Sequence, residues 1–254
     1  MSHDAIIEMR QVCKRLGGQK VLDGLDLAVP RGETLVIMGR SGAGKSVILK
    51  HMIGLMRPDS GEVLFDGAPL GQMSRSHLNE VRKRFGMLFQ GAALFDSMSV
   101  GNNVSAGLRR HTRLSAAEIE DVVRSKLEAV GLSGVESRMP AELSGGMRKR
   151  VGLARAIAMN PEVILYDEPT TGLDPITADS INDLIVDTRR NLGVTSVVVT
   201  HDVQSALKVG TRFCFLLDGR IYFNGGGEQL RSTDDPAVRQ FLEGRAVGPL
   251  TAMH

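Results

Sequence analysis

A glycine-rich loop between an apolar strand and a helix constrains the fold of this chain more than any other feature. Residues 39–46 read GRSGAGKS and match the pattern G-x-x-x-x-G-K-[ST]. The preceding segment, TLVIM at 34–38, is almost wholly apolar, as expected for a strand buried on both faces. A chance match has a probability of roughly 1% in a chain of ordinary glycine content. The sequence therefore predicts a phosphate-binding loop inside an α/β fold.

The residue types in this loop suit a bound phosphate chain. Glycines allow backbone N–H groups to point at phosphate oxygens, and the start of the following helix adds its positive dipole end. Lys45 supplies a positive charge for the β- and γ-phosphates, while Ser46 offers a hydroxyl to Mg²⁺. The residues predicted to contact the nucleotide here are Gly39, Arg40, Ser41, Gly42, Ala43, Gly44, Lys45 and Ser46.

A second apolar strand ends in two acidic residues. Its segment VILY at 163–166 is followed directly by Asp167 and Glu168. A buried strand of an open α/β sheet delivers the residues at its C-terminal end to the ligand-binding crevice. We expect Asp167 to hold Mg²⁺ through water and Glu168 to orient or deprotonate an attacking water molecule. A solvated strand end would explain the pair equally well on its own, but the phosphate loop favours the functional interpretation.

Strand-like and helix-like segments alternate along most of the chain, which indicates an α/β domain with a mainly parallel sheet. The expected strands are residues 6–9, 34–38, 63–65, 86–89, 163–166, 196–200, 213–217 and 221–223. The expected helices are residues 45–56, 75–83, 116–130, 145–159, 178–191 and 204–210. Ser115 and Glu118 form a capping-box pattern at the third of these helices. Residues from Gln90 to about Pro161 contain no convincing strand, so we expect a helical insertion there.

Composition excludes several classes of protein. The chain has 31 Lys and Arg against 29 Asp and Glu, no tryptophan and 4% aromatic residues, which argues against nucleic-acid binding. No run approaches the ~18–20 apolar residues of a membrane span, and the first ten residues lack the apolar core of a signal peptide. Two cysteines, Cys13 and Cys214, cannot form a disulfide framework. We therefore expect a cytoplasmic globular protein.

A third motif, LSGGM at 143–147, precedes a helix-like segment. Ser144 suits the N-cap position, and the amides that follow it are open to an anion. On its own, this motif is explained better by a capped helix with two flexible glycines. The order of all the motifs is more informative. They are the phosphate loop, MLFQ ending at Gln90, LSGG, the acidic strand end, TGLD at 171–174, and SVVVT followed by His201. In this order they resemble the ATP-binding subunits of ABC transporters over nearly the whole chain.

Three stretches carry a closer resemblance, to the ABC ATPases that drive lipid transport with Mce-type partners. This subgroup includes the Mla and toluene-tolerance ATPases. The stretches are MLFQGAALFDSMSVGNNV at 87–104, LSGGMRKRVGLARAIAMNP at 143–161 and DPAVRQFLEGRAVGP at 235–249. Met147 stands where most ABC signatures have glutamine, which is typical of this subgroup.

The resemblance implies a P-loop NTPase (RecA-like) α/β core with an N-terminal antiparallel β subdomain and an inserted helical subdomain that carries the signature. Residues 1–254 would form a single ABC ATPase domain. Its α/β nucleotide-binding core would comprise 1–89 and 162–235, its helical subdomain 90–161 and its C-terminal tail 236–254. In the tail, Val238, Phe241 and Leu242 have helical spacing, so we expect an amphipathic helix that docks on its own or a neighbouring chain.

The family pattern also implies a head-to-tail homodimer, in which each ATP lies between Lys45 of one chain and Ser144 of the other. Glu168 would act as the base, His201 would contact the γ-phosphate, and Asp174 would lie at the dimer seam. The implied catalytic residues are Lys45, Gln90, Glu168 and His201. The implied Mg²⁺ ligands are Ser46, Gln90 and Asp167. The nucleotide-binding set gains Leu16, Ser144, Gly145, Gly146 and Asp174.

The implied function is an ATP-hydrolysing motor at the cytoplasmic face of the bacterial inner membrane, which powers phospholipid transport through an integral-membrane permease. A Mce-type lipid-binding subunit and a small regulatory subunit are further implied partners, and nucleic acid is not. Alternatives are an ABC ATPase that drives import or export of a different substrate, and a soluble ABC-type ATPase of translation or DNA repair. The soluble alternative is disfavoured by the single phosphate loop and the lack of a heptad run. Intact Glu168 and His201 argue against a non-hydrolysing ATP binder.

Three segments allow further interpretations. Most family members place an aromatic residue about thirty positions before the loop lysine, but the comparable residue is Leu16, which offers no π-stacking. We therefore expect weak discrimination between ATP and GTP. The basic run at 148–150 (Arg148, Lys149 and Arg150) is expected to form a solvated helix face. Leu94, Phe95 and Met98 suit either local core or a groove for a short helix of a membrane partner.

Overall fold

The computed structural model describes residues 5–251, and the contacts between its residues divide the chain into two compact units. The first unit comprises Met1–Gln72 and Val198–His254, and the second comprises Met73–Val197. The boundary between the units falls inside strand β8 (Thr195–Thr200). Both predicted limits of the helical subdomain, residues 90 and 161, lie inside the second unit.

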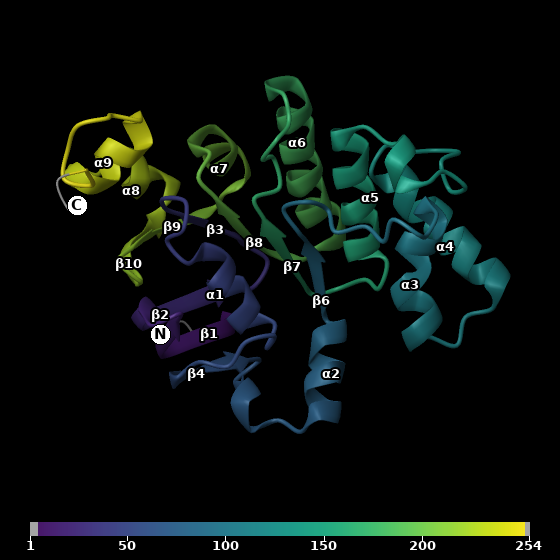
Figure 1. Ribbon diagram of the computed structural model, residues 1–254, viewed down its shortest axis with the longest axis horizontal. Helices are drawn as coiled ribbons and strands as arrows, with labels where there is room; N and C mark the ends of the chain where they lie inside the picture. The colour runs from purple at the N-terminus through teal and green to yellow at the C-terminus, as the bar shows by residue number, and fades with distance from the viewer. Residues whose placement is uncertain (1–4, 252–254) are drawn as a thin grey trace. The chain divides into compact units, whose positions relative to one another are not determined.

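The N-terminal strands of the first unit form an antiparallel sheet in the order β2-β1-β4-β5 (Figure 1). These strands are β1 (Ala5–Leu16), β2 (Gln19–Pro30), β4 (Ser60–Phe65) and β5 (Ala68–Pro69), and the last is followed by a single 3₁₀ turn, η1 (Leu70–Gln72). A two-residue turn joins β1 to β2 and places Leu16 opposite Gln19. Apolar side chains from β1 and β2, including Val12 and Leu25, are fully buried on one face. The antiparallel subdomain expected from the resemblance is therefore present.

A second set of strands in the first unit carries the phosphate loop. β3 (Thr34–Met38) is fully buried and pairs in parallel with β9 (Arg212–Leu217), which pairs antiparallel with β10 (Arg220–Gly226). α1 (Lys45–Met52) follows β3, and α7 (Val203–Val209) packs against β3. β10 leads into α8 (Gly227–Ser232) and α9 (Pro236–Glu243). The rings of Phe241 and Phe215 have centroids 4.9 Å apart, so the predicted tail helix docks on its own chain.

The second unit holds a parallel strand pair and the expected helical insertion (Figure 1). β6 (Phe85–Leu88) pairs with β7 (Val163–Asp167). Between these two strands in sequence lie α3 (Val100–His111), α4 (Ala116–Ala129), the 3₁₀ turn η2 (Pro140–Glu142) and α5 (Gly145–Ile157). α3, α4 and α5 pack against one another in every pairing. α2 (Arg75–Lys83) precedes β6, and α6 (Pro175–Leu192) follows β7.

The helix and strand limits differ from the sequence expectations at a few places. β2 was not expected, because Gly24 and several charged residues interrupt its apolar pattern. The helix expected at 178–191 begins at Pro175, since Asp174 accepts hydrogen bonds from the amides of Ile176 and Thr177 and so caps an earlier start. The Ser115 capping box is confirmed. Among residues 5–251 no helix has the length and apolar character needed to cross a membrane.

Candidate functional site

The phosphate loop links the end of β3 to the start of α1 and has the backbone conformation that its glycines allow. Gly42 and Gly44 have φ values of 81° and 101°, in the left-handed region that other residues rarely adopt. A Cβ at Gly44 would lie 2.8 Å from Cγ1 of Val21, which is too close for any larger residue. The loop therefore needs glycine for its backbone conformation at both positions and for its close packing on Val21 at Gly44, and a backbone loop of this kind forms a cradle for phosphate oxygens.

Lys45 is folded back along the loop. Its Nζ donates hydrogen bonds to the carbonyl oxygens of Gly39, at 2.9 Å, and Arg40, at 3.0 Å. Only 6% of Lys45 is exposed. A buried ammonium group needs hydrogen-bond acceptors. The two carbonyl oxygens therefore hold the charge of Lys45 inside the loop, where it would meet a bound phosphate chain.

A cavity of about 520 Å³ lies beside the loop. Its walls come from four segments of the first unit: the start of β2 at 19–21, the phosphate loop at 40–43, the β9–β10 turn at 216–219, and Leu250. This volume falls within the roughly 300–1,000 Å³ of small-molecule sites. Leu16, the predicted base contact, is 40% exposed at the end of β1 and is not among these lining residues. Its role stays a prediction.

His201 directly follows β8 and lies in the first unit. Asp202, the next residue, caps α7 by accepting hydrogen bonds from the amides of Gln204 and Ser205. The Asp202 amide donates to Oγ1 of Thr200 at 3.0 Å. His201 is thus anchored between a buried strand and a capped helix, with its side chain exposed.

In the second unit, Asp167 ends β7, Glu168 follows it directly, and each is 9% exposed. Glu168 has a φ of 48°, a left-handed conformation that is strained for a residue with a side chain. Oγ1 of Thr171 donates to Oε2 of Glu168 at 3.2 Å. Residues that their surroundings hold in a strained backbone conformation cluster at functional sites. The strain at Glu168 therefore supports its predicted role in orienting or deprotonating the attacking water.

Lys149 connects two of the predicted catalytic residues. Its Nζ donates to the carbonyl oxygen of Gln90, and also to that of Glu168 at 3.3 Å. The lysine is 5% exposed, and burial lowers its pKa, while the carboxylates of Asp167 and Glu168 oppose that shift. Two segments that lie far apart in sequence are therefore held by one ammonium group.

The expectation of a solvated face at 148–150 holds for Arg148, which is exposed, but is wrong for Lys149, which is buried. Besides Lys149, Arg148 donates to the carbonyl of Leu143 at 2.6 Å, and Arg150 donates to the carbonyl of Val130 at 2.5 Å. Three consecutive helical residues spread over roughly 200° of the helix surface, so a packed helix cannot turn all of them to solvent. The sequence alone could have indicated this, because residues 148–150 lie within a segment expected to form a helix.

The signature residues form two adjacent capped helix starts. Ser144 caps α5 and accepts a hydrogen bond from the amide of Met147 at 3.2 Å. Asp174 caps α6, and hydrogen bonds from the hydroxyl and amide of Thr177 lower its pKa. A Cβ at Gly146 would lie 2.6 Å from Cγ2 of Thr177, so close packing of α5 on α6 requires this glycine. The structure thus brings the LSGG and TGLD motifs together.

The loop that follows Gln90 is strained and carries an exposed aromatic ring. Ala92 and Ala93 have φ values of 60° and 48°. Arg155 donates to their carbonyl oxygens, at 2.6 and 2.7 Å, and its guanidinium lies 5.9 Å from the ring centroid of Phe95. Phe95 is 53% exposed and Met98 39%. This exposure favours the predicted partner surface over local core for these two side chains.

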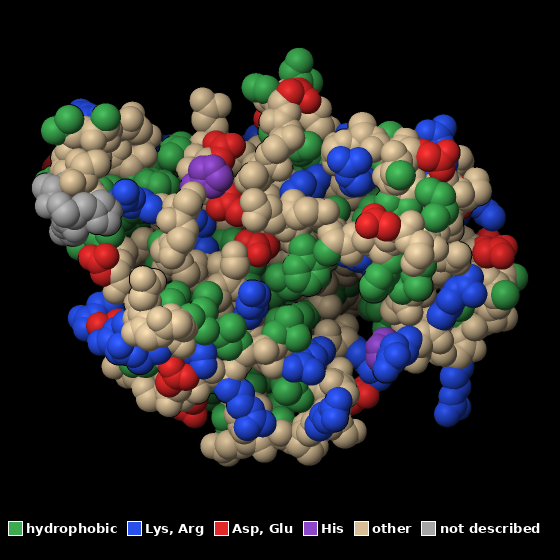
Figure 2. Space-filling model, in the orientation of Figure 1, with side chains coloured by type: hydrophobic (Ala, Val, Ile, Leu, Met, Phe, Trp, Pro, Cys, Tyr) green, Lys and Arg blue, Asp and Glu red, His purple; other side chains and the backbone are tan. Residues whose placement is uncertain are grey.

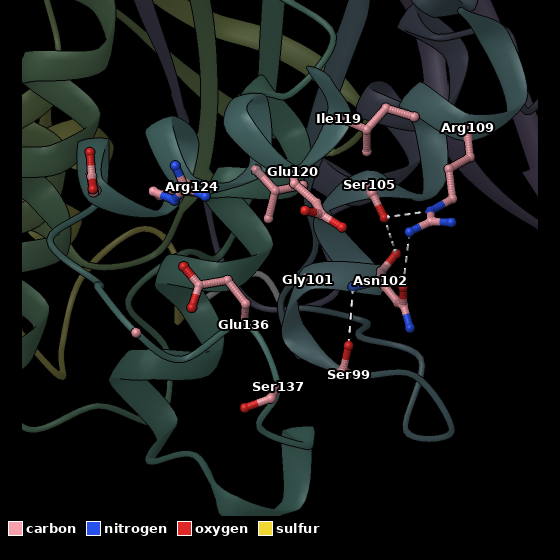
Figure 3. A pocket seen from close by; sticks show the side chains of 13 residues that line it. Ser99, Gly101, Asn102, Ser105, Arg109, Ile119, Glu120, Arg124, Glu136 and Ser137 are labelled. Atoms are coloured by element: carbon pink, nitrogen blue, oxygen red, sulfur yellow. Dashed lines mark hydrogen bonds between the residues drawn. The ribbon is translucent and has the colours of Figure 1, made fainter. Parts of the chain in front are cut away.

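The second unit also contains a cavity of about 580 Å³ between α3, α4 and residues 134–137 (Figure 3). Arg109 is oriented there by its hydrogen bond to Oγ of Ser105 at 3.1 Å, and the amide of Gly101 donates to the carbonyl of Glu136 at 2.8 Å. None of the predicted site residues lines this cavity. It is therefore separate from the predicted nucleotide chemistry.

The donor types of the predicted metal ligands fit Mg²⁺. Ser46, Gln90 and Asp167 offer only oxygen ligands through hydroxyl, amide and carboxylate groups, and Mg²⁺ prefers oxygen and keeps several waters. In the part of the chain that the structure describes, no cluster of three or more His, Cys, Asp or Glu side chains could hold a metal ion. Basic and acidic side chains lie interspersed on the face shown in Figure 2, in keeping with the net charge of +2.

Comparison with known proteins agrees with this geometry. The sequence profile of the ABC transporter family matches residues 22–171. The chain is 47% identical to the intermembrane phospholipid transport system ATP-binding protein MlaF of Escherichia coli (strain K12), over 96% of this chain and 91% of that protein. It is 43% identical to the probable ribonucleotide transport ATP-binding protein mkl of Mycobacterium tuberculosis (strain ATCC 25618 / H37Rv), over 96% of this chain and 68% of that protein.

Solved structures show the same architecture. The ATP-binding cassette MJ0796, solved as a dimer in a post-hydrolysis state with ADP and phosphate, is 32% identical with a TM-score of 0.80, covering 87% of this chain and 98% of that one. CbiO1 of Clostridium perfringens, part of the ABC transporter complex cbiONQ, is 30% identical with a TM-score of 0.82, covering 96% of both chains. The expected P-loop NTPase fold is confirmed. With its phosphate loop, acidic strand end and signature helix in place, this chain belongs to the ABC transporter family, as one of its ATP-binding and ATP-hydrolysing subunits.

Proposed function

We propose that this chain is the ATPase subunit that powers phospholipid transport through a membrane permease at the cytoplasmic face of the bacterial inner membrane. The 47% identity to MlaF over nearly the whole chain supports this substrate, since that protein is named for intermembrane phospholipid transport. Met147 and the 87–104 segment, which resemble the lipid-transport subgroup, agree with this substrate.

The glycine cradle with Lys45 folded inside it is the observation that carries the proposed ATP site. The amides of the loop and Lys45 hold the phosphate chain, and the apolar part of the adjoining cavity receives the nucleoside. Ser46, Asp167 and Gln90 would hold Mg²⁺, which when bound would offset the negative charge of the phosphates. Glu168 would orient and deprotonate the attacking water, and His201 would contact the γ-phosphate.

The two capped helix starts suit the other side of a nucleotide sandwich. Ser144, Gly145 and Gly146 present the N-terminus of α5, whose dipole favours a phosphate of a second copy. Asp174, beside them at the start of α6, lies at the seam of the proposed head-to-tail homodimer. Closure of this dimer on ATP and its opening after hydrolysis would be the power stroke.

The proposed partners are the permease, a Mce-type lipid-binding subunit and a small regulatory subunit. Phe95 and Met98 suit the permease contact, because both side chains are apolar and exposed on an ordered loop. Phe95→Asp should then prevent assembly with the permease while leaving nucleotide affinity unchanged.

The test is purification of the tagged chain from membranes, identification of its companions, and reconstitution of the complex in proteoliposomes. Transfer of a fluorescent phospholipid should require ATP and should stop in complexes that carry Lys45→Ala or Glu168→Gln. Glu168→Gln should still bind ATP, which makes it the matched control for Lys45→Ala. Lipid transfer that proceeds equally with Lys45→Ala would refute the proposal. ATP-dependent uptake of a ribonucleotide without lipid transfer would instead favour the function named for mkl.

A further inference from the structure

The chain continues past α9 into a short segment, residues 245–251, which we call the C-terminal strap. Gly244 ends α9, and the side chain of Gln240 then fixes both ends of the strap. Nε2 of Gln240 donates to the carbonyl of Arg245 at 3.1 Å, and its Oε1 accepts from the amide of Leu250 at 2.8 Å. Gln240 is 5% exposed, so the strap is tied to the chain through a buried amide.

The strap packs closely against Gln240 along its length. A Cβ at Gly248 would lie 2.5 Å from Cδ of Gln240, so only glycine fits there. Thr251 closes a turn with Gly248 through its amide, at 3.0 Å, and its hydroxyl, at 2.8 Å. The strap therefore has a defined path, which brings Leu250 to the side of the phosphate loop.

Leu250 bonds to the phosphate loop and also borders the cavity beside it. Its carbonyl oxygen accepts a hydrogen bond from Nη1 of Arg40, the second residue of the loop, at 2.9 Å. Leu250 also lines the 520 Å³ cavity beside the loop and is only 5% exposed. The other walls of this cavity come from the start of β2, from the phosphate loop, and from the end of β9 with the turn that follows it. The amide of Asp23 in β2 bonds to the carbonyl of Gly219 in that turn at 3.0 Å. The strap thus adds a wall from outside these two strands, their turn and the phosphate loop.

We infer that the C-terminal strap is part of the nucleotide site, with Leu250 contacting the nucleoside of the bound nucleotide, and that nucleotide binding and strap docking stabilise each other. A leucine side chain cannot stabilise phosphate charge, so its contact belongs to the sugar and base. Leu16 does not line the cavity, which leaves Leu250 as an apolar surface for the nucleoside beside Val21 and Leu216. This inference rests on the proposed nucleotide site in the phosphate loop.

The first test compares ligands with and without a nucleoside. Binding of a non-hydrolysable ATP analogue and of tripolyphosphate, each with Mg²⁺, is measured by titration calorimetry on the full-length chain. Leu250→Ala should weaken the ATP analogue about tenfold and leave tripolyphosphate unchanged. Val247→Ala is the matched control, because Val247 lies in the same strap and is 87% exposed. Its affinities should stay within about twofold of the unaltered chain.

The second test needs no substitution, which keeps the inference falsifiable if Leu250→Ala folds poorly. The Leu250 amide is bonded to Gln240, so its hydrogen exchange reports whether the strap is docked. Linkage is reciprocal, so the ATP analogue should slow this exchange, while tripolyphosphate should slow it less.

The outcomes separate this inference from the proposed function. Unchanged ATP affinity in Leu250→Ala, together with Leu250 exchange that does not respond to nucleotide, would overturn the strap's role and leave the phosphate loop as the ATP site. Equal loss of ATP analogue and tripolyphosphate would overturn the nucleoside contact. Failure of Lys45→Ala to weaken either ligand would overturn the proposed nucleotide site itself.

Discussion

Replacing Lys149 by methionine removes the ammonium group that contacts both of the loops predicted to be catalytic in the second unit, at Gln90 and Glu168, but keeps most of the buried side chain. Hydrogen bonds to charged groups contribute roughly 1.5–3 kcal/mol each, and Lys149 donates two to the carbonyls of Gln90 and Glu168. Burying the ammonium costs several kcal/mol, and the lowered pKa of Lys149 shows that this cost outweighs the attraction of the nearby carboxylates. These effects oppose each other, so we expect the free energy of unfolding to change by less than about 2 kcal/mol.

The catalytic rate should change much more than the stability. Lys149 holds the carbonyl of Gln90 close to that of Glu168, and a shift of about 1 Å in a catalytic group costs roughly 100-fold in rate. We therefore expect kcat for ATP hydrolysis to fall about 100-fold, or about 2.7 kcal/mol in barrier height. The affinity for ATP should stay within about twofold, because the phosphate loop has its own bonds.

Steady-state ATPase rates, with ATP binding measured by calorimetry and folding by thermal melting, test this expectation. Lys126→Met is the matched control, since Lys126 is a lysine of the same unit whose pKa burial also lowers, and its Nζ donates to Oδ1 of Asn160, which is not a predicted site residue. Lys149→Gln, which keeps an N–H donor, should recover part of the lost rate. A folded Lys149→Met protein with kcat within about threefold of the unaltered chain would show that the lysine does not position these loops.

Three further predictions concern single residues. Gly44→Ala should abolish ATP binding in calorimetry, because its Cβ would meet Val21 at 2.8 Å and φ is 101°; retained affinity would contradict the cradle. Burial lowers the pKa of His51 below its unfolded value of about 6.5. The unfolded chain then takes up the proton first as the pH falls, so stability in urea should decrease from about pH 6.5 downward by up to about 1.4 kcal/mol per pH unit. His51→Leu should lack this component, and an identical pH dependence would refute it. Burial raises the pKa of the Cys214 thiol to about 12, so iodoacetamide at pH 8 should label it only after unfolding, as mass spectrometry can show; rapid labelling of the folded chain would be inconsistent with this burial.

Much of the phosphate loop and the fold class could be predicted because they depend on local residue types. The loop sequence, the apolar strands that end at Met38 and Asp167, and the capping box at Ser115 all follow from spacing over a few residues. The backbone strain at Glu168 could not be predicted, since its left-handed conformation depends on the contacts around it and a glutamate carries no local sign of it.

Two of the missed features involve tertiary contacts between distant segments, and a third involves strand pairing. Lys149 was misassigned because charge runs are usually solvated, and its burial depends on carbonyls 59 and 19 residues away. The place of Leu250 depends on a bond to Arg40, which lies 210 residues earlier. β2 escaped notice because its pairing with β1 outweighs the weak strand propensity of Gly24 and the neighbouring aspartates.

The loop after Gln90 has a consequence for assembly. Arg155 holds Ala92 and Ala93 in their left-handed conformations within the isolated chain, so this segment is already ordered beside the exposed ring of Phe95. The conformational entropy of this segment is therefore lost when the chain folds and not when a partner binds. A protein that binds at Phe95 would therefore meet a preorganised surface, and the binding free energy would not be reduced by the cost of ordering this loop.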